Sequence, residues 1–325
     1  MTKKLISIVS ACYNEEQTIA ELHIRIQQIF FTIPDCDYEL IFVDDSSSDN
    51  SQKIFNEIVA KDSQVKVARL SRNFGNPQYC YLAGMSIATG DAVIFIDADL
   101  QYPPELIVDF LAHWRAGYKV VYGIRSRCHE NVVRKAGYYL FYRIFSFLCS
   151  FNIPKDAGDF GLMDRCVVDI ILSLPEKDVF LRGLRAWVGF KQIGLEYTQL
   201  PRKKGQTKFS FFDYIRTAKD AFVNFSARPL ELISYMAILS AFFTGVISCV
   251  FLYLAFTTEA PRGFFTLILT MLFFGTIQLT ALGVLAEYLI RIFREVKHRP
   301  SFIIEQVLTL KKNPKDCLNT NDEDH

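Results

Sequence analysis

The sequence predicts an α/β fold built around a mostly parallel β-sheet, followed by two hydrophobic segments near the C-terminus. Over the first 125 residues, short apolar runs alternate with segments of helical period, which is the pattern of βαβ units. Two later apolar stretches are each long enough to cross a bilayer. At 325 residues, the chain also exceeds the roughly 250 residues at which a single hydrophobic core stops growing, so we expect two parts.

Five strands are predicted in the α/β part, each enriched in Val, Ile or Phe and followed by polar residues or glycine. They are Leu5–Ser10, Tyr38–Val43, Val65–Leu70, Ala92–Ile96 and Lys119–Tyr122. The segments between them predict helices at Glu16–Phe30, Ser51–Ala60, Gln78–Ala88 and Pro104–Trp114. Asp49 is a candidate N-cap of the second helix, and Pro104 suits the first turn of the fourth.

Two further segments mix basic residues with many tyrosines and phenylalanines, which is typical of helices that lie along a membrane surface. The first is Arg134–Phe151, and the second begins at Lys208 and covers 208–229. A pair of ordinary helices that face a hydrophobic core is the alternative for these two segments.

The two hydrophobic segments near the C-terminus, Leu230–Phe256 and Phe264–Ile290, are predicted to be transmembrane helices. Basic residues lie before the first segment and after the second, namely Arg216, Lys219, Arg228, Arg291, Arg294, Lys297 and Arg299. The positive-inside rule then places the α/β part and both termini in the cytoplasm, on a multi-pass protein of the inner membrane. The region 291–325 is predicted to be a cytoplasmic tail that ends in a disordered segment.

The composition argues against several kinds of partner and site. Lysine and arginine (36) nearly balance aspartate and glutamate (35), so the overall charge gives no reason to expect a nucleic-acid partner. The eight cysteines show no C-x-x-C spacing and no companion histidines, so we expect reduced cytosolic thiols rather than a zinc site. The first residues lack the long apolar core of a signal peptide, and we therefore expect none.

Two aspartates directly follow the fourth predicted strand. Asp97 and Asp99 stand one residue apart at its carboxyl end, where open α/β sheets bind their ligands. Mg²⁺ and Mn²⁺ prefer oxygen ligands and usually take one or two carboxylates together with phosphate oxygens of a substrate. The pair therefore predicts a divalent-metal site for a nucleotide diphosphate, whereas an isolated pair of this kind is more often part of a solvated loop.

Acidic and polar residues also follow the first two strands. Asp44 and Asp45 come after the second strand, and Tyr13 and Glu15 come after the first. These groups are expected at the same edge of the sheet, where carboxylates can accept hydrogen bonds from a base and a ribose. The alternative for the polar residues after Asp45 is that they only cap the following helix.

Several motifs, in this order, resemble those of the family 2 inverting glycosyltransferases. They are Tyr13–Glu16, Phe42–Asp49, Leu70–Gly75, Asp97–Glu105 and Arg202–Phe209. Within that family, the chain is similar to the branch that contains dolichyl-phosphate mannose synthase and bactoprenol glucosyltransferase. The resemblance covers nearly all of the α/β part, and the two C-terminal segments suit the bactoprenol glucosyltransferases.

The resemblance implies a GT-A fold, a Rossmann-like catalytic domain, over residues 1–207. It implies that Asp97, Asp99 and Gln101 hold Mg²⁺ or Mn²⁺ on the diphosphate of the donor. The residues that it assigns to the nucleotide-sugar are Tyr13, Glu15, Asp44, Asp45, Arg72, Asn73, Asp97, Ala98 and Asp99. The basic residues that it assigns to acceptor or donor phosphates are Arg125, Arg127, Arg202 and Lys208. Attraction to anionic lipid headgroups is the alternative role for these basic residues.

Asp159 occupies the position at which related transferases keep a catalytic base, and Asp156 is an alternative occupant. A phosphate monoester has a second pKa of about 6, so a lipid phosphate is already anionic at neutral pH and can attack without losing a proton. We therefore expect Asp159 to orient the acceptor or the sugar, with base catalysis as the second option. Gly161 stands where many relatives carry a basic residue, which leaves one acceptor contact unassigned.

The resemblance implies an enzyme that transfers a hexose, preferably glucose from UDP-glucose, to undecaprenyl or another polyprenyl phosphate. Inversion gives a β-linked polyprenyl-phosphate sugar at the cytoplasmic face of the membrane. GDP-mannose is the alternative donor, and the branch suggests a homotetramer. Two other functions remain as alternatives: a non-catalytic membrane adaptor, and a processive polysaccharide synthase, whose Gln-x-x-Arg-Trp motif Leu181–Trp187 only partly matches.

Overall fold

The structure is a computed structural model that describes residues 3–125, 157–176, 180–198 and 263–310, together with separate positions between 233 and 253. The chain forms two compact units. One unit comprises residues 1–137, 153–208 and 300–325, and the other comprises 138–152 and 209–299. The predicted interfacial helices at 134–151 and 208–229 lie outside the described residues.

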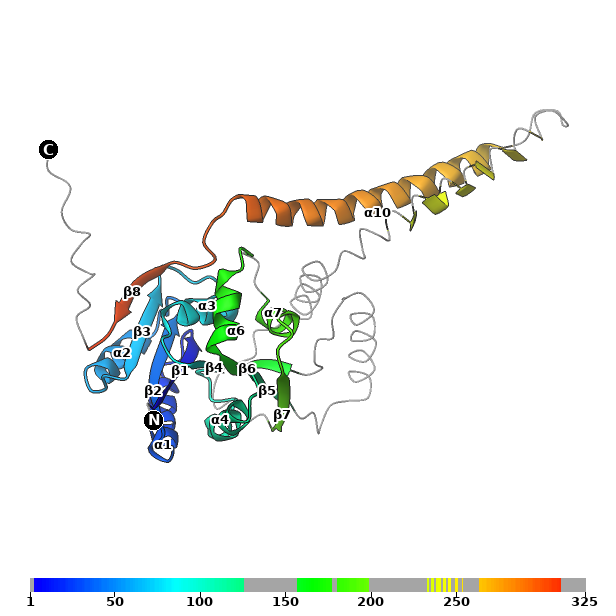
Figure 1. The fold of residues 1–325 in the computed structure, drawn as a ribbon. Helices are drawn as coiled ribbons and strands as arrows, with labels where there is room; N and C mark the ends of the chain where they lie inside the picture. The colour runs from blue at the N-terminus through cyan, green and yellow to red at the C-terminus, as the bar shows by residue number, and fades with distance from the viewer. Residues whose placement is uncertain are drawn as a thin grey trace, which may run out of the picture. The chain divides into compact units, whose positions relative to one another are not determined.

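An eight-stranded sheet forms the centre of the first unit (Figure 1). Within the described ranges, its strands follow the order β7-β5-β6-β4-β1-β2-β3-β8. They are β1 (Lys4–Cys12), β2 (Cys36–Asp44), β3 (Val65–Leu70), β4 (Ala92–Asp97), β5 (Val120–Arg125), β6 (Ala157–Asp164), β7 (Gln192–Tyr197) and β8 (Ile304–Leu308). The helices are α1 (Ile19–Phe31), α2 (Ser51–Val59), α3 (Pro77–Ile87), the 3-10 turn η1 (Pro104–Leu106), α4 (Ile107–Arg115), α6 (Arg165–Ser173) and α7 (Leu181–Trp187).

Strands β1 to β4 form the parallel middle of the sheet. Consecutive residues such as Ile8 and Val9 are both fully buried, and consecutive side chains of a strand point to opposite faces, so both faces are covered. Helices α1, α2 and α4 pack into one hydrophobic core with these strands, whereas α3 contacts β1, β2 and α6. The mostly parallel α/β sheet predicted from the alternating apolar runs is confirmed.

The helix starts differ in detail from the sequence prediction. Asn50, not Asp49, is the residue before α2, and its side chain makes no capping hydrogen bond. Asp49 nevertheless accepts a hydrogen bond from the backbone N–H of Ser51 at 3.0 Å, so it still satisfies one free amide at the helix start. Pro104 begins the 3-10 turn η1, which leads directly into α4, so the predicted fourth helix is a tight turn followed by an α-helix.

Three strands were not predicted, and they explain how the sheet is completed. β6 lies between β4 and β5 and runs antiparallel to both of them. β4 and β5 therefore run in the same direction. β7 pairs in parallel with β5, and β8 pairs antiparallel with β3 at the other edge. The predicted tail at 291–325 therefore contributes both the end of a long helix and a strand of the sheet.

The second unit contains α10 (Phe264–Val296), a helix of 33 residues that spans about 50 Å. Its segment Phe273–Ile290 has a mean hydropathy of 1.5, none of it is buried within the structure, and it is long enough to cross a membrane. It is the single candidate span among the described residues and lies within the second predicted hydrophobic segment. The first predicted segment, Leu230–Phe256, is described only at separate positions, so a pair of C-terminal spans is not confirmed.

Asp164 connects several elements at the end of β6. Its carboxylate caps α6 through the backbone N–H of Cys166 at 3.1 Å. It also accepts hydrogen bonds from the indole of Trp114 at 2.8 Å and from Nζ of Lys119 at 2.9 Å. Burial alone would raise the pKa of Asp164, but these three hydrogen bonds outweigh it and lower the pKa to about 2.

Replacing Asp164 with alanine should lower the free energy of unfolding by about 1–3 kcal/mol, because a helix cap and two partly buried hydrogen bonds are lost. The folded pKa of about 2 lies below the ordinary aspartate value of about 3.9. The stabilisation is therefore complete above a pH of about 4 and is lost as the pH falls toward 2. Thermal unfolding of the full chain as a function of pH measures the effect.

Asp169→Ala is the matched control for this experiment, because Asp169 is an exposed aspartate of α6 whose ion pair among the described residues is with Arg165 of the same helix. A difference between wild type and Asp164→Ala that stays constant down to a pH of about 3 would contradict the assignment.

Candidate functional site

The carboxyl ends of β1, β2, β3 and β4 lie side by side because these four strands are parallel. The loops that follow them carry most of the residues predicted for a nucleotide-sugar. The loop after β4 begins against β1, since the N–H of Ala98 donates to the carbonyl of Ala11 in β1 at 3.2 Å. The sheet therefore brings the predicted donor-binding residues of these loops to one edge.

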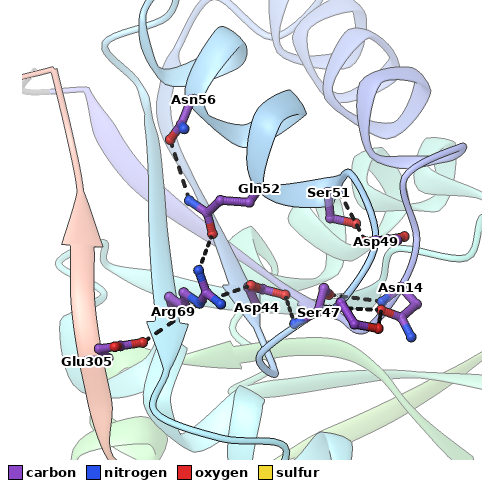
Figure 2. Close-up of polar contacts among 10 residues, drawn as sticks. Asn14, Asp44, Ser47, Asp49, Ser51, Gln52, Asn56, Arg69 and Glu305 are labelled. Carbon is purple, nitrogen blue, oxygen red and sulfur yellow. Dashed lines mark hydrogen bonds and ion pairs between the residues drawn. The ribbon is translucent and has the colours of Figure 1, made fainter.

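Hydrogen bonds fasten the loop after β1 to the loop after β2. The backbone N–H of Asn14 donates to Oγ of Ser47 at 2.9 Å, and the N–H of Ser48 donates to Oδ1 of Asn14 at 2.9 Å (Figure 2). Glu16 accepts from both nitrogens of Asn50. Asn14 and Ser46 have positive φ angles of 56° and 59°, a conformation that costs energy and is held here by these contacts.

Asp44 and Asp45 are adjacent in sequence but occupy different environments. Asp44 has no exposed surface, and its Oδ1 accepts a hydrogen bond from the N–H of Ser47 at 3.0 Å. Asp45 accepts hydrogen bonds from the backbone of the loop after β3, from the N–H of Phe74 at 2.9 Å and that of Gly75 at 3.4 Å. Burial raises the pKa of Asp45 above its ordinary value. In this conformation a ligand cannot touch Asp44, which instead shapes the loop that carries Asp45.

The other predicted donor residues of the first three loops lie nearer to the surface. Tyr13 is 42 % exposed, and Glu15 is half-buried. Arg72 is exposed, with its guanidinium 4.0 Å from the centre of the Phe74 ring. Asn73 accepts a hydrogen bond from the N–H of Gly75 at 2.6 Å. The loops after β1 and β3 therefore carry an exposed tyrosine, a half-buried carboxylate, an exposed arginine and an amide.

The aspartate pair after β4 is held in a partly buried position. Asp97 accepts a hydrogen bond from the hydroxyl of Tyr81 at 2.5 Å, and Asp99 accepts one from the N–H of Gln101 at 3.1 Å. Ala98 between them is buried. Burial, followed by the negative charge of Asp99, raises the pKa of Asp97 to about 7. A cation placed between the two carboxylates would relieve this repulsion.

The chemistry of these side chains fits a divalent metal. Asp97 and Asp99 offer the hard oxygen ligands that Mg²⁺ and Mn²⁺ prefer. In the described part of the chain, no group of three or more His, Cys, Asp and Glu side chains forms a metal site. The two aspartates would therefore hold an ion only together with other oxygen ligands, such as phosphate groups or water.

Asp159 on β6 forms an ion pair with Arg182 of α7. Nε and a terminal nitrogen of Arg182 donate to the two oxygens of Asp159 at 2.9 and 2.8 Å, which is the two-pronged geometry of strong arginine–carboxylate pairs. Burial by itself would raise the pKa of Asp159, but the charge and hydrogen bonds of Arg182 outweigh it and hold the pKa below its usual range. Asp159 is therefore ionised, and its negative charge also raises the pKa of Asp97.

Arg185 is a second arginine beside Asp159, and it is only 2 % exposed. It donates one hydrogen bond, to the carbonyl of Gly158 at 3.2 Å, and its guanidinium lies 4.5 Å from the centre of the Tyr122 ring. Burial lowers the pKa of Arg185 to about 10, and the charge of Asp159 opposes this shift. Two arginines thus flank one buried carboxylate.

Sequence reasoning missed Arg182 and Arg185 as partners of Asp159. The available signal was their spacing, because residues three apart on a helix lie on the same face.

Arg125 ends β5 and is exposed, beside Tyr197 in the sheet register. The predicted phosphate-binding residues Arg127, Arg202 and Lys208, and the alternative acid Asp156, lie outside the described residues.

Comparisons with known proteins identify the kind of domain that carries this site. A family model described as glycosyl transferase family 2 matches residues 7–169. A protein of Bacillus subtilis (strain 168), described as the uncharacterized glycosyltransferase YkcC, is 42% identical over 302 residues, which cover 92% of this chain and 93% of that protein. The prophage bactoprenol glucosyl transferase homolog of Escherichia coli (strain K12) is 34% identical over 310 residues, or 93% of this chain and 99% of that protein.

A solved structure shows a weaker likeness. It is that of S. aureus TarS 1-349 in complex with UDP-GlcNAc, with a TM-score of 0.45 and 17% identity over 68% of this chain and 67% of that chain. A likeness at this level adds nothing to what the two relatives and the family model establish.

The ion pair between Asp159 and Arg182 should be measurable as a coupling in unfolding experiments. We expect Asp159→Ala and Arg182→Met each to lower the free energy of unfolding. The loss in the double variant should be smaller than the sum of the two single losses by about 0.5–3 kcal/mol. Asp159→Ala should be the more harmful single change, because it leaves the buried Arg185 without its nearest negative charge. Strict additivity in this double-mutant cycle would show that the pair contributes nothing.

Proposed function

We propose that this chain, which belongs to glycosyl transferase family 2, transfers a hexose from a nucleotide-sugar to a polyprenyl phosphate. UDP-glucose is the preferred donor and undecaprenyl phosphate the preferred acceptor, and the product is a β-linked polyprenyl-phosphate sugar. The name of the Escherichia coli relative, a bactoprenol glucosyl transferase homolog aligned over nearly its whole length, supports a glucosyl group as the one transferred and a polyprenyl acceptor.

The observation that carries the proposal is the aspartate pair at the end of β4, beside the joined loops of β1, β2 and β3. Such a pair can hold Mg²⁺ or Mn²⁺ together with a diphosphate, and Asp97 and Asp99 are the residues that would do so. When bound, the ion would supply positive charge that stabilises the departing nucleotide diphosphate. Gln101, which directly follows Asp99 in the same loop, is the third residue proposed at this position.

The loops after β1, β2 and β3 would bind the nucleotide. Tyr13, Glu15 and Asp45 would contact the base and ribose, and Arg72 and Asn73 would lie near the rest of the donor. Asp44 supports this half of the site from beneath, since its side chain has no accessible surface. Asp44 would therefore act on the donor indirectly, unlike the other residues predicted in these three loops.

The acceptor would be bound on the β5–β6 side of the site. Arg125, with Arg127, Arg202 and Lys208, would neutralise the phosphate groups, because an arginine can bind two phosphate oxygens at once. Asp159 would orient the acceptor or the sugar hydroxyls. Its pairing with Arg182 and its lowered pKa support an orienting role over base catalysis.

The proposed reaction is a single in-line displacement at the anomeric carbon. An oxygen of the lipid phosphate attacks C1 of the sugar, and the bond between C1 and the diphosphate oxygen breaks with its electron pair remaining on the nucleoside diphosphate. No proton has to be removed from the acceptor, because a phosphate monoester with a second pKa of about 6 is mostly dianionic at neutral pH. Attack from the face opposite the leaving group inverts the configuration.

Attachment to a membrane follows from the acceptor, which does not leave the bilayer. The apolar segment Phe273–Ile290 of α10 supports membrane association. We further propose that Leu230–Phe256 forms a second span, that the catalytic unit lies on the cytoplasmic side of the inner membrane, and that the chain assembles as a homotetramer.

Asp99→Ala should reduce sugar transfer by roughly a hundredfold or more while the protein remains folded, because the charge of the departing diphosphate is no longer balanced. EDTA should abolish transfer by the wild type, and added Mg²⁺ or Mn²⁺ should restore it. The assay follows labelled UDP-glucose into undecaprenyl phosphate with the full chain in detergent.

Asp109→Ala is the control, since Asp109 is an exposed aspartate in the first turn of α4 and is not among the predicted site residues. Undiminished sugar transfer in the presence of EDTA would show that the reaction needs no divalent metal. If no sugar were transferred from any of a panel of UDP- and GDP-sugars, the proposed reaction would be wrong.

A further inference from the structure

The C-terminal strand β8 places a carboxylate next to the loops proposed to bind the nucleotide. β8 pairs antiparallel with β3, and the register shifts at Arg69: Arg69 lies opposite Gln306, and Leu70 lies opposite Ile304. Glu305 is therefore an extra residue in the β8 strand, the arrangement of a β-bulge. Bulges redirect side chains, and the carboxylate of Glu305 lies 3.7 Å from Nε of Arg69.

Arg69 joins β8 to the buried Asp44 (Figure 2). Its Nε lies 4.0 Å from Oδ2 of Asp44, which is its register partner on β2. A terminal nitrogen of Arg69 donates to Oε1 of Gln52 on α2 at 3.3 Å. The Arg69 guanidinium thus contacts the buried carboxylate of Asp44, the exposed carboxylate of Glu305 and helix α2.

Asp44 needs this arginine for an electrostatic reason. Its side chain has no exposed surface, and within the described residues its Oδ2 makes no hydrogen bond. A buried carboxylate is costly unless a positive charge or hydrogen bonds compensate it. The N–H of Ser47 donates a hydrogen bond to Oδ1 of Asp44, and Arg69 forms an ion pair with Oδ2.

The charge on Asp44 is connected to the loops of the site. Asp44 holds the N–H of Ser47, and the hydroxyl of Ser47 in turn accepts a hydrogen bond from the N–H of Asn14 at 2.9 Å. Asn14 and Ser46 both have positive φ angles, so this part of the two loops is strained and depends on its contacts. A shift of the Asp44 carboxylate would be transmitted to the neighbouring Tyr13 and Asp45.

We propose that Arg69 is a positioning residue for the nucleotide half of the site, and that the bulge of β8 sets its place through Glu305. This inference rests on the proposed function, because the loops concerned are those assigned to the donor. The C-terminal segment after α10 is then part of the support of the active site and not only a tail.

The test measures binding of UDP with Mn²⁺ by calorimetry, together with the KM for each substrate, on the full chain in detergent. Arg69→Met should raise the Kd of UDP by roughly fivefold or more, and Glu305→Gln by roughly two- to fivefold. The KM of the lipid acceptor should stay unchanged for both variants. A purely structural defect would lower the fraction of protein that binds without changing its Kd, so the fitted stoichiometry separates the two causes.

Arg69 could act by compensating the charge of Asp44 or only by holding β8 against β3. Exchanging the charges of Arg69 and Glu305 distinguishes these two roles. The double variant R69E/E305R restores an ion pair between the strands but places a glutamate against Asp44. We expect no rescue of UDP binding by this double variant, whereas Arg69→Lys should recover part of it. Full rescue by the exchange would overturn the proposal, because fastening alone would then explain Arg69.

Gln306→Ala, an exposed neighbour on β8, is the control and should bind UDP like the wild type. Wild-type affinity in both Arg69→Met and Glu305→Gln would overturn this inference and leave the proposed function intact. Failure of the wild type to bind any nucleotide would overturn the proposed function, and this inference with it.

Discussion

Negative charges crowded around the end of β4 are the constraint on which the rest of the site depends. Asp97, Asp99 and Asp159 approach closely enough that two of these charges raise the pKa of the third, Asp97, in addition to the effect of burial. The protein balances Asp159 with Arg182 and Arg185, but Asp97 is held by the neutral hydroxyl of Tyr81. The charge of Arg182 thus offsets Asp159 and also acts on Asp97, and a cation between Asp97 and Asp99 would reduce the remaining repulsion.

The parallel sheet explains why so many polar groups can be gathered without unfolding the domain. Its middle strands are mostly apolar and buried on both faces, which stabilises the fold. Two buried polar residues within them, Ser7 of β1 and Glu39 of β2, are joined by a hydrogen bond, and the polar residues of the candidate site follow at the strand ends. Contacts between the loops, from Asn14 to Ser47 and from Asp45 to Phe74, then fix the polar ends relative to one another. Loops held by such contacts lose less conformational entropy when they bind a ligand.

Sequence reasoning predicted the parts that depend on local periodicity. Strands β1 to β5 and helices α1 to α4 alternate along the chain, and their apolar runs are visible without any knowledge of pairing. It missed β6, β7 and β8, because each of them pairs with strands that lie far earlier in the chain. It also treated Asp44 and Asp45 as equivalent, since nothing in a pair of adjacent acids reveals that one faces the interior. The partners of Asp159 and Asp44, namely Arg182 and Arg69, depend on the same long-range pairing.

The measurement that tests the account most directly is the effect of a divalent ion on nucleotide binding. UDP would be titrated calorimetrically into the full chain in detergent, once with Mn²⁺ and once with EDTA. The account predicts that Mn²⁺ tightens UDP binding by roughly tenfold or more, equivalent to about 1.4 kcal/mol, and that Asp97→Asn removes most of this gain. The same Kd with Mn²⁺ and with EDTA would contradict it.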